Sequence, residues 1–270
     1  MDRTAATFEF SGVSLRMKRV DLNCDMGEVA EAVTGGAQEE LLRCVTSANV
    51  ACGGHAGDAA MMQATIEQCL RHGVAIGAHP GYEDRANFGR IEVKLSREEV
   101  AASVHRQVRA LAEIAACYGA RITHVKPHGA LYNHAARERE LASAIAEGVA
   151  RWTKDVVLLG LAGSAMLEEF RAAGFRVAAE AFADRRYDPD RSLRSRKFQD
   201  ALFRNPEEAA AQAVQIVERG SVIAADGSAV SLHAQTICIH GDTPGCTQIA
   251  AAVNRALRAA GIELKAISAV

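Results

Sequence analysis

Short apolar segments that end in polar residues recur along this chain. In an extended backbone alternate side chains share a face, so the polar face of one such segment consists of His124, Lys126 and His128. A lysine between two imidazoles suits proton transfer or anion binding, although a solvated edge strand can have the same pattern. Related segments occur at 21–25, 49–55, 75–81, 180–184 and 238–242. Six such segments favour parallel strands whose carboxyl ends converge on one site.

The sequence between these polar tips predicts helices. Strands are expected at 19–24, at a segment ending near 51, and at 74–78, 121–126, 156–161, 176–181 and 236–239, with a hairpin over 222–232 and a candidate short strand within 262–267. Helices are expected near 38–45, 59–72, 96–118 and 137–152, at a segment ending at 174, from 206 onward and over 247–261. Capping residues support three of the helix starts: Asp58, Ser96 with Glu99, and Asn205.

The recurring order of strand, polar tip and helix predicts an α/β fold. We expect a closed or nearly closed (β/α) barrel of about seven parallel strands, in a single domain over residues 17–270. Residues 1–16 match neither the helical nor the strand periodicity and are expected to be an N-terminal extension. Met17 is therefore a candidate translation start.

The composition narrows the class of protein. Hydrophobic residues make up 49% of the chain and aromatic residues 5%, so the core must consist mainly of aliphatic side chains. The net charge is −2 and the sequence contains no basic stripe, so it lacks the clustered positive charge of a nucleic-acid-binding protein. Seven cysteines without a CxxC pair indicate a reducing compartment, and no apolar segment is as long as a membrane span. We therefore expect a cytoplasmic protein that binds neither nucleic acid nor membrane.

The polar tips contain long motifs that resemble those of the LamB/YcsF family, in order from about residue 19 to 262. The motifs that carry the resemblance are 20–28, 47–58, 77–82, 125–133 and 238–242. The resemblance implies a seven-stranded (β/α) barrel similar to the glycoside hydrolase and deacetylase barrels. It also implies the catalytic subunit of a 5-oxoprolinase, which uses ATP with Mg²⁺ to open the lactam 5-oxoproline (pyroglutamate) to L-glutamate together with partner subunits B and C. The oligomeric state is left open, with a homo-oligomer as one alternative.

The chain departs from the family's usual pattern in the loop 188–203. Pro189–Ser192 stands where the family usually has a glycine, and Lys197–Ala201 stands where it often reads Pro-Gly-Ala. This Arg-rich loop is either solvated or a lid that brings cations to an anionic ligand. The departures therefore bear on the lid and on the range of substrates.

Opening a lactam at neutral pH needs an activated water, stabilisation of developing charge and an acid for the departing amine. We expect Asp25, together with His55 or His128, to activate water. Lys126 and Arg185 are expected to oppose carboxylate or phosphoryl oxygens. His240 or Glu180 is the expected proton donor. Residues expected to bind substrate or nucleotide are Asn23, Glu28, Asn49, Gly54, His79, Tyr82, Asp184, Arg185, Tyr187 and Asp242.

The sequence leaves two questions open: whether a divalent metal is bound, and where ATP binds. Asp25, His55, His79, His128 and His240 are residue types that bind zinc or a similar ion, but no helical HxxxH or HExxH pair fixes a triad, which favours a site without metal. The chain also lacks a GxxxxGK[ST] loop, so ATP binds either at these strand ends or mainly on the partner subunits.

Two other functions fit the same residues. One is a metal-dependent carbohydrate deacetylase, which would act without ATP. The other is a non-catalytic subunit that binds oxoproline or carbohydrate and passes it to its partners; the low aromatic content argues against a sugar-binding platform.

Overall fold

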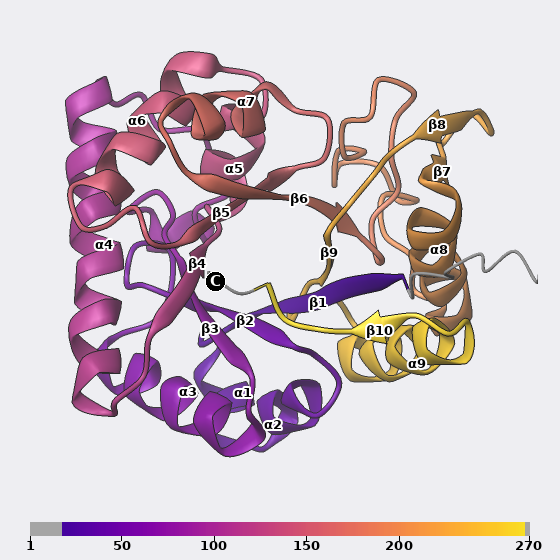
Figure 1. The fold of residues 1–270 in the computed structure, drawn as a ribbon, viewed down its shortest axis with the longest axis horizontal. Coiled ribbons are helices and arrows are strands. Elements are labelled where there is room, and N and C mark those ends of the chain that lie inside the picture. The colour runs from indigo at the N-terminus through magenta and orange to yellow at the C-terminus, as the bar shows by residue number, and fades with distance from the viewer. Residues whose placement is uncertain (1–17, 268–270) are drawn as a thin grey trace, which may run out of the picture.

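A closed ring of parallel strands forms the centre of the computed structural model, which describes residues 18–267 (Figure 1). Each strand is hydrogen-bonded to the next in the order β1–β2–β3–β4–β5–β6–β9, and β9 pairs with β1 to close the ring. The strands are β1 (Arg19–Met26), β2 (Ser47–Ala51), β3 (Ala75–His79), β4 (Ile122–Val125), β5 (Val157–Leu161), β6 (Arg176–Phe182) and β9 (Thr236–Ile239). The predicted seven-stranded α/β barrel is therefore confirmed. The expected extension over 1–16 and Met17 lie outside the described residues.

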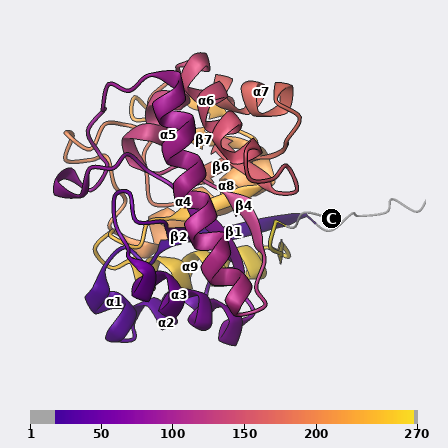
Figure 2. The same ribbon diagram turned by 90° about the vertical axis from the view of Figure 1, so that its left-hand side faces the viewer.

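Helices surround the ring, and the longest of them, α4, crosses the side of the molecule shown in Figure 2. The helices are α1 (Ala30–Thr34), α2 (Ala37–Leu42), α3 (Ala59–His72), α4 (Arg97–Cys117), α5 (Gly129–Ala135), α6 (Arg139–Ala150), α7 (Ala165–Ala172), α8 (Pro206–Arg219) and α9 (Cys246–Ala259). A hairpin of β7 (Ser221–Ile223) and β8 (Ala229–Ser231) follows α8, and β10 (Glu263–Leu264) pairs with the start of β1. None of the helices within 18–267 is both long and apolar enough to cross a lipid bilayer.

The three predicted helix caps are confirmed. The Asp58 side chain accepts from the Met61 amide, Ser96 and Glu99 form a complete capping box, and Asn205 accepts from the Glu207 amide. Each cap satisfies an amide that the first helical turn leaves unpaired.

Two short helices, α5 and α1, were missing from the predicted elements. The single helix expected near 137–152 is preceded by a separate short helix, α5, which starts directly after His128 because the apolar residues 130–131 and 135–136 pack into the core. The helix expected near 38–45 consists of α2 alone, with α1 before it. In both places short helices follow a strand tip too closely for a window of helical periodicity to separate them.

A hydrogen-bonded polar network fills the barrel below its mouth. Asp21 accepts from Ser47 Oγ at 2.6 Å and from Thr236 Oγ1 at 2.5 Å, which links β1 to β2 and β9. Asn23 Nδ2 donates to Thr236 Oγ1 at 2.6 Å and to Glu180 Oε1 at 3.0 Å, which adds β6. Buried polar groups are stable only when they are paired, so this network specifies which strands are neighbours.

Gly77 on β3 leaves space for an imidazole inside the barrel. A Cβ at residue 77 would lie 2.1 Å from Nε2 of His124 on β4. That nitrogen lies 2.9 Å from Asn49 Oδ1, and burial, followed by the nearby Lys126 charge, lowers the pKa of His124 to about 3. His124 is therefore a neutral structural side chain of the barrel interior.

Candidate active site

A cavity of about 740 Å³ opens at the carboxyl ends of the strands. Its wall includes Asp25 from β1, His79 from β3, and Lys126, His128 and His240 from the loops after β4 and β9. The segment between β6 and α8, residues 183–205, contributes further lining residues and is called the lid segment below. In (β/α) barrels this end of the strands is where active sites lie.

Lys126 forms a buried ion pair at the bottom of the cavity. Its Nζ lies 2.9 Å from Asp25 Oδ1, 3.1 Å from Glu180 Oε1 and 3.0 Å from Cys238 Sγ. Burial would raise the pKa of Asp25, but His79 and Lys126 outweigh it, so the pKa of that carboxyl lies well below its usual range. Asp25 is therefore ionised at neutral pH and holds Lys126 in its charged form.

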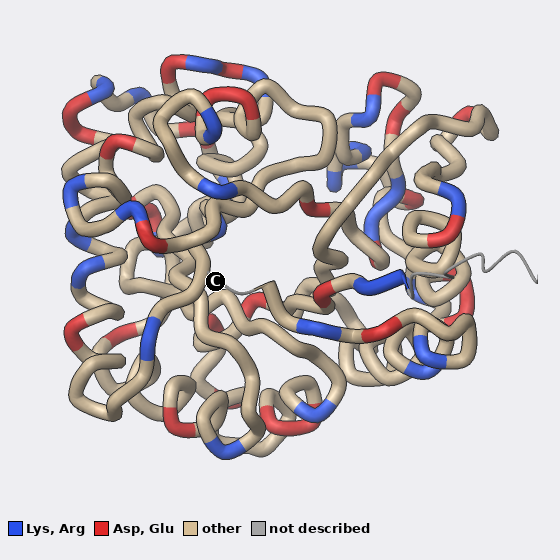
Figure 3. Tube along the Cα trace, in the orientation of Figure 1, with Lys and Arg blue, Asp and Glu red and all other residues tan. Residues whose placement is uncertain are grey.

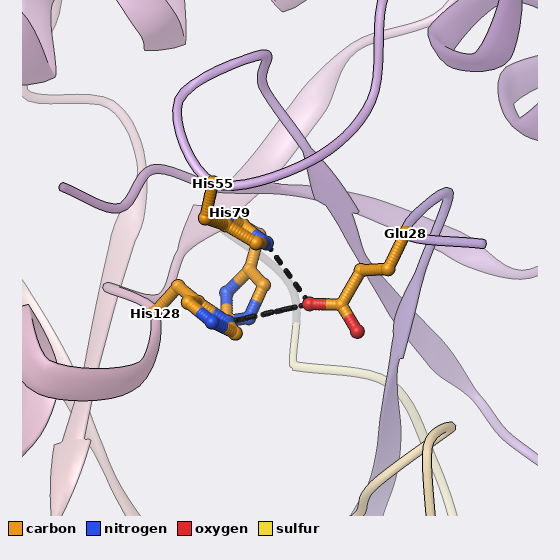
Figure 4. Close-up of side chains that lie close together, drawn as sticks. All are labelled: Glu28, His55, His79 and His128. Carbon is orange, nitrogen blue, oxygen red and sulfur yellow. Dashed lines mark hydrogen bonds and ion pairs between the residues drawn. The ribbon is translucent and has the colours of Figure 1, made fainter. Parts of the chain in front are cut away.

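Glu28 and three histidines form a compact cluster beside this ion pair (Figure 4). Glu28 Oε1 lies 2.9 Å from His55 Nε2, 3.3 Å from His128 Nδ1 and 3.8 Å from His79 Nε2. The rings of His55 and His128 are stacked with centroids 3.5 Å apart. One potential ligand atom from each of the four residues lies within 4.8 Å of every other, and all four side chains are largely buried.

Backbone carbonyls fix the orientation of two rings in this cluster. His79 Nδ1 donates to the Lys126 carbonyl oxygen at 2.7 Å, and His128 Nε2 donates to the Phe88 carbonyl oxygen at 2.9 Å. Phe88 is a non-glycine residue in the left-handed region, with φ 54°, a costly conformation that recurs at functional sites. The nitrogens that face the centre of the cluster, His79 Nε2 and His128 Nδ1, are therefore available to share a proton or bind a cation.

Electrostatics keep most of the cluster in defined charge states. Burial lowers the pKa of His55 to about 4, although Glu28 acts against this, so His55 is neutral at pH 7. Burial also lowers the pKa of His128. Burial would lower the pKa of His79 as well, but the Asp25 charge outweighs it and raises this pKa above its ordinary value.

His240 on the cavity wall is paired with the buried Asp184 behind it. His240 Nδ1 lies 3.0 Å from Asp184 Oδ1, and Asp184 Oδ2 accepts from Thr243 Oγ1 at 2.6 Å. Burial opposes the charged carboxylate, but His240 and Thr243 outweigh it and lower the pKa of Asp184 to about 2. Because Asp184 engages Nδ1, Nε2 is the ring nitrogen of His240 without a hydrogen bond among the described residues, and it is available to a ligand in the cavity.

The lid segment is folded back on itself. Arg194 pairs with Asp188 at 3.0 Å and with Asp200 at 2.8 Å, and single β-bridges join Arg185 to Leu202 and Tyr187 to Leu193. Asp242, in the loop after β9, forms ion pairs with Arg90 from the loop after β3 and with Arg196 from the lid segment. Three loops are thus connected across the mouth of the cavity.

Most of the predicted site residues lie at the mouth of the cavity or directly beneath it. Those of the ion pair, the cluster and the lid converge on one mouth, as the sequence analysis expects: Asp25, Glu28, His55, His79, Lys126, His128, Asp184, Arg185, His240 and Asp242. Asn23, Asn49 and Glu180 lie directly beneath them in the polar network, where Asn49 Nδ2 donates to Asp25 Oδ1 at 2.8 Å.

Three predicted binding residues lie away from the cavity wall. Gly54 lies against Gln107, where a Cβ would come within 2.4 Å of Oε1. Tyr82 is buried in the hydrophobic core, and the Tyr187 hydroxyl accepts from the Phe182 amide at 2.8 Å. Their positions give all three a packing role.

Three residues of the site were missing from the predicted set. Cys238, which contacts Lys126, lies on β9 two positions before His240, and Tyr132 lies four positions after His128, so alternation and helical spacing could have indicated both. The buried Tyr132 hydroxyl has no hydrogen-bond partner among the described residues. Arg90 carries no local signal, because its place depends on the fold of a long loop.

Comparisons with known proteins agree with this architecture. The LamB/YcsF family profile matches residues 20–270. The A subunit of 5-oxoprolinase from Chloroflexus aggregans is 49% identical over 249 residues, which is 92% of this chain and 99% of that protein. The corresponding A subunit from Bacillus licheniformis is 46% identical over 252 residues, which is 93% of this chain and 100% of that protein.

Solved structures show the same barrel. The lactam utilization protein from Thermus thermophilus superposes with a TM-score of 0.86 at 43% identity, over 92% of this chain and 100% of that one. A family 4 carbohydrate esterase from Streptomyces lividans in complex with acetate has a TM-score of 0.52 at 11% identity, over 93% and 94% of the two chains. The second likeness concerns the fold alone.

Proposed function

Because this chain belongs to the LamB/YcsF family, we propose that it is the A subunit of a 5-oxoprolinase, which opens 5-oxoproline to L-glutamate with hydrolysis of ATP. The observation that carries the proposal is the meeting of Lys126, the Glu28 cluster and His240 at one cavity. These groups provide a fixed positive charge, a site for activating water and a proton donor, which lactam hydrolysis requires.

The proposed reaction begins with activation of the amide. The amide oxygen forms a bond to the γ-phosphorus of ATP while the bond from that phosphorus to ADP breaks. Water then adds to the activated carbon, the carbon–nitrogen bond breaks and the ring nitrogen takes a proton. The resulting acyl phosphate reacts with a second water to give glutamate and inorganic phosphate. The overall reaction therefore converts oxoproline, ATP and the two waters into glutamate, ADP and inorganic phosphate.

The geometry suggests how the chain's own residues divide this work. Asp25 is a poor base because its pKa is strongly lowered, and its role here is to hold Lys126 charged beneath the reacting amide. His55 or His128 is the better acceptor for the proton of water, since burial lowers the pKa of both and keeps them neutral. His240 lines the cavity with Nε2 free and suits the proton donor, whereas Glu180 lies beneath Lys126 and off the cavity wall.

The Glu28 cluster also fits a divalent metal ion. Glu28, His55, His79 and His128 offer three imidazole nitrogens and one carboxylate oxygen, a donor set that zinc accepts. The carbonyls that orient His79 and His128 are the outer partners that metal-binding histidines usually have. A bound ion would act as a Lewis acid and lower the pKa of water. A second group, Asp25, Cys238 and His240, fits less well because the Lys126 ammonium already contacts two of its members.

In this proposal the ATP-binding site lies outside this chain. The sequence lacks a P-loop, so we assign the ATP site, with Mg²⁺, to partner subunits B and C, and ring opening to this chain. The relatives are named as one lettered component of 5-oxoprolinase, which supports a complex of several subunits.

The decisive experiment measures oxoproline consumption and glutamate formation by this chain alone, and then with subunits B and C, each with and without ATP. We expect turnover only in the complex with ATP. The exchange His240→Gln should lower kcat by about 10²- to 10⁴-fold, the usual contribution of a general acid. The matched control is His233→Gln, because His233 is exposed and outside the cavity.

The same assay separates the other two functions. Release of acetate from acetylated carbohydrate by the chain alone, without ATP, would replace the proposal with a deacetylase. Undiminished turnover in a complex with His240→Gln and His128→Ala would leave this chain with a binding role only.

A further inference from the structure

The lid segment supplies the cavity with more positive charge than one carboxylate needs. Arg185, Arg191, Arg196 and Lys197 all line the cavity, and Asp190 is the one acidic lid residue that does so. Figure 3 shows several basic positions along the segment between β6 and α8. Oxoproline carries a single carboxylate, which one arginine can bind through two hydrogen bonds.

Arg185 is buried and only partly engaged. Its side chain is 5% exposed, and its Nη2 donates to the Arg194 carbonyl oxygen at 2.7 Å. Its Nε has no hydrogen-bond partner among the described residues. An unpaired donor on a buried cation is costly, and a bound anion would relieve this cost.

Arg191 and Lys197 provide further charge that the protein itself does not neutralise. Neither forms an ion pair within residues 18–267, in contrast to Arg196, which pairs with Asp242. Arg191 has φ 74°, a conformation that L-residues rarely adopt, and its side chain lies close to Gly163 at the cavity wall. Such backbone strain persists at binding sites when the surrounding structure enforces it.

A phosphoryl group matches this arrangement better than a second carboxylate or a whole nucleotide does. It carries close to two negative charges at neutral pH and three acceptor oxygens, enough to engage several basic side chains. The aromatic residues of the cavity wall, Tyr132 and Phe182, are both buried and leave no exposed face on which an adenine could stack. The cavity therefore provides for the phosphate and lactam parts of a ligand and not for a purine.

We propose that Arg185, Arg191 and Lys197 form a subsite for a phosphoryl group, through which this chain receives the lactam already phosphorylated on its amide oxygen. This inference rests on the proposed function. It assigns phosphoryl transfer from ATP to one of the partner subunits, and the subsequent ring opening to this chain.

Calorimetric titration of the full chain with inorganic phosphate, tripolyphosphate and ATP tests the subsite without any turnover. We expect all three probes to bind, and ATP to bind no more tightly than tripolyphosphate. Arg185→Gln and Arg191→Gln should each weaken binding by about tenfold or more, since each exchange removes a charged hydrogen-bond donor from the anion. Arg191 is exposed, so its exchange tests the subsite even if Arg185→Gln impairs folding.

The matched control is Arg204→Gln, which removes the same charge near the end of the lid segment but outside the cavity, and should change affinity by less than about twofold. The proposed subsite would be overturned if none of the three phosphate probes bound, or if all three variants bound them with equal affinity. Much tighter binding of ATP than of tripolyphosphate would assign the charge to a nucleotide and overturn the claim of a phosphorylated lactam.

Oxoproline hydrolysis by the complete complex is measured separately. If the complex hydrolyses oxoproline but this chain does not bind phosphate, the subsite is contradicted and the proposed function still holds. Phosphate binding without hydrolysis by the complex contradicts the proposed function instead.

Discussion

His79 Nε2 and His128 Nδ1 face each other at 3.0 Å, while the other nitrogen of each ring donates to a backbone carbonyl. Both inward nitrogens carry a lone pair when the rings are neutral, so the pair is stable only if a proton or a cation lies between them. Glu28 Oε1, 3.3 Å from His128 Nδ1, adds the negative charge that a cation would need.

This relationship predicts that the chain binds about one zinc-like ion. His128→Ala should lower the metal content measured by mass spectrometry after equilibration with zinc, and should weaken affinity by more than the about 10- to 100-fold that loss of an outer partner of a metal-binding residue typically causes. His105→Ala on α4 is the control, since it removes an imidazole outside the cavity. Equal metal content in both variants would rule out the cluster as the binding site.

Replacing Lys126 should destabilise the protein as well as inactivate it. Lys126→Met leaves Asp25 and Glu180 buried without their shared cation, and breaking a buried pair in this way typically costs about 3–5 kcal/mol. Urea unfolding measures the loss. The double variant Asp25→Asn with Lys126→Met removes one stranded charge and should recover part of the stability; if it is less stable than Lys126→Met, the ion pair is not the cause.

Gly77→Ala should disturb the barrel interior through His124. The added methyl group overlaps the imidazole, so we expect a loss of about 1–3 kcal/mol or more in thermal unfolding. In a His124→Ala background the space is open and the same exchange should cost clearly less. Equal costs in the two backgrounds would contradict a contact between these residues.

Asp184 should contribute to stability in a defined pH range. Its folded pKa of about 2 is below its ordinary value of 3.8, so its contribution is complete above about pH 4 and is lost as the pH falls toward 2. A shift of this size corresponds to about 2 kcal/mol. Asp184→Asn should therefore lower the melting temperature at pH 7 and flatten the acid limb between pH 4 and 2, whereas Asp155→Asn, at an exposed position, should follow the unmodified protein.

Alternation of polar and apolar residues was sufficient to predict the barrel and the convergence of its polar tips. It shows which side chains share a strand face, and Asp21, Asn23 and Asp25 do share one. It does not show which strands are neighbours across the ring, so the contacts from Lys126 to Asp25 and Cys238 could not be derived.

Contacts made by loops were the least predictable. The position of Glu28 next to three histidines depends on three separate loops and the end of β3, and none of these residues has a ligand partner at a fixed local spacing. For this reason the absence of a helical metal motif is weak evidence for a site without metal. The sequence also did not show that Tyr82 and Tyr187 lie in the hydrophobic core, because polar aromatic residues in a charged loop can serve as core residues.

The closure of the ring by β9 against β1 has a consequence for biosynthesis. Asp21 and Thr236, which hydrogen-bond across that seam, are 215 residues apart in the chain. A nascent polypeptide can pair β1 with β2 early, but the edge of β1 that faces β9 stays unpaired, with Asp21 not yet bonded to Thr236, until β9 has left the ribosome. Such long-range pairing slows folding and leaves an open strand edge, the kind of surface through which partly folded chains aggregate.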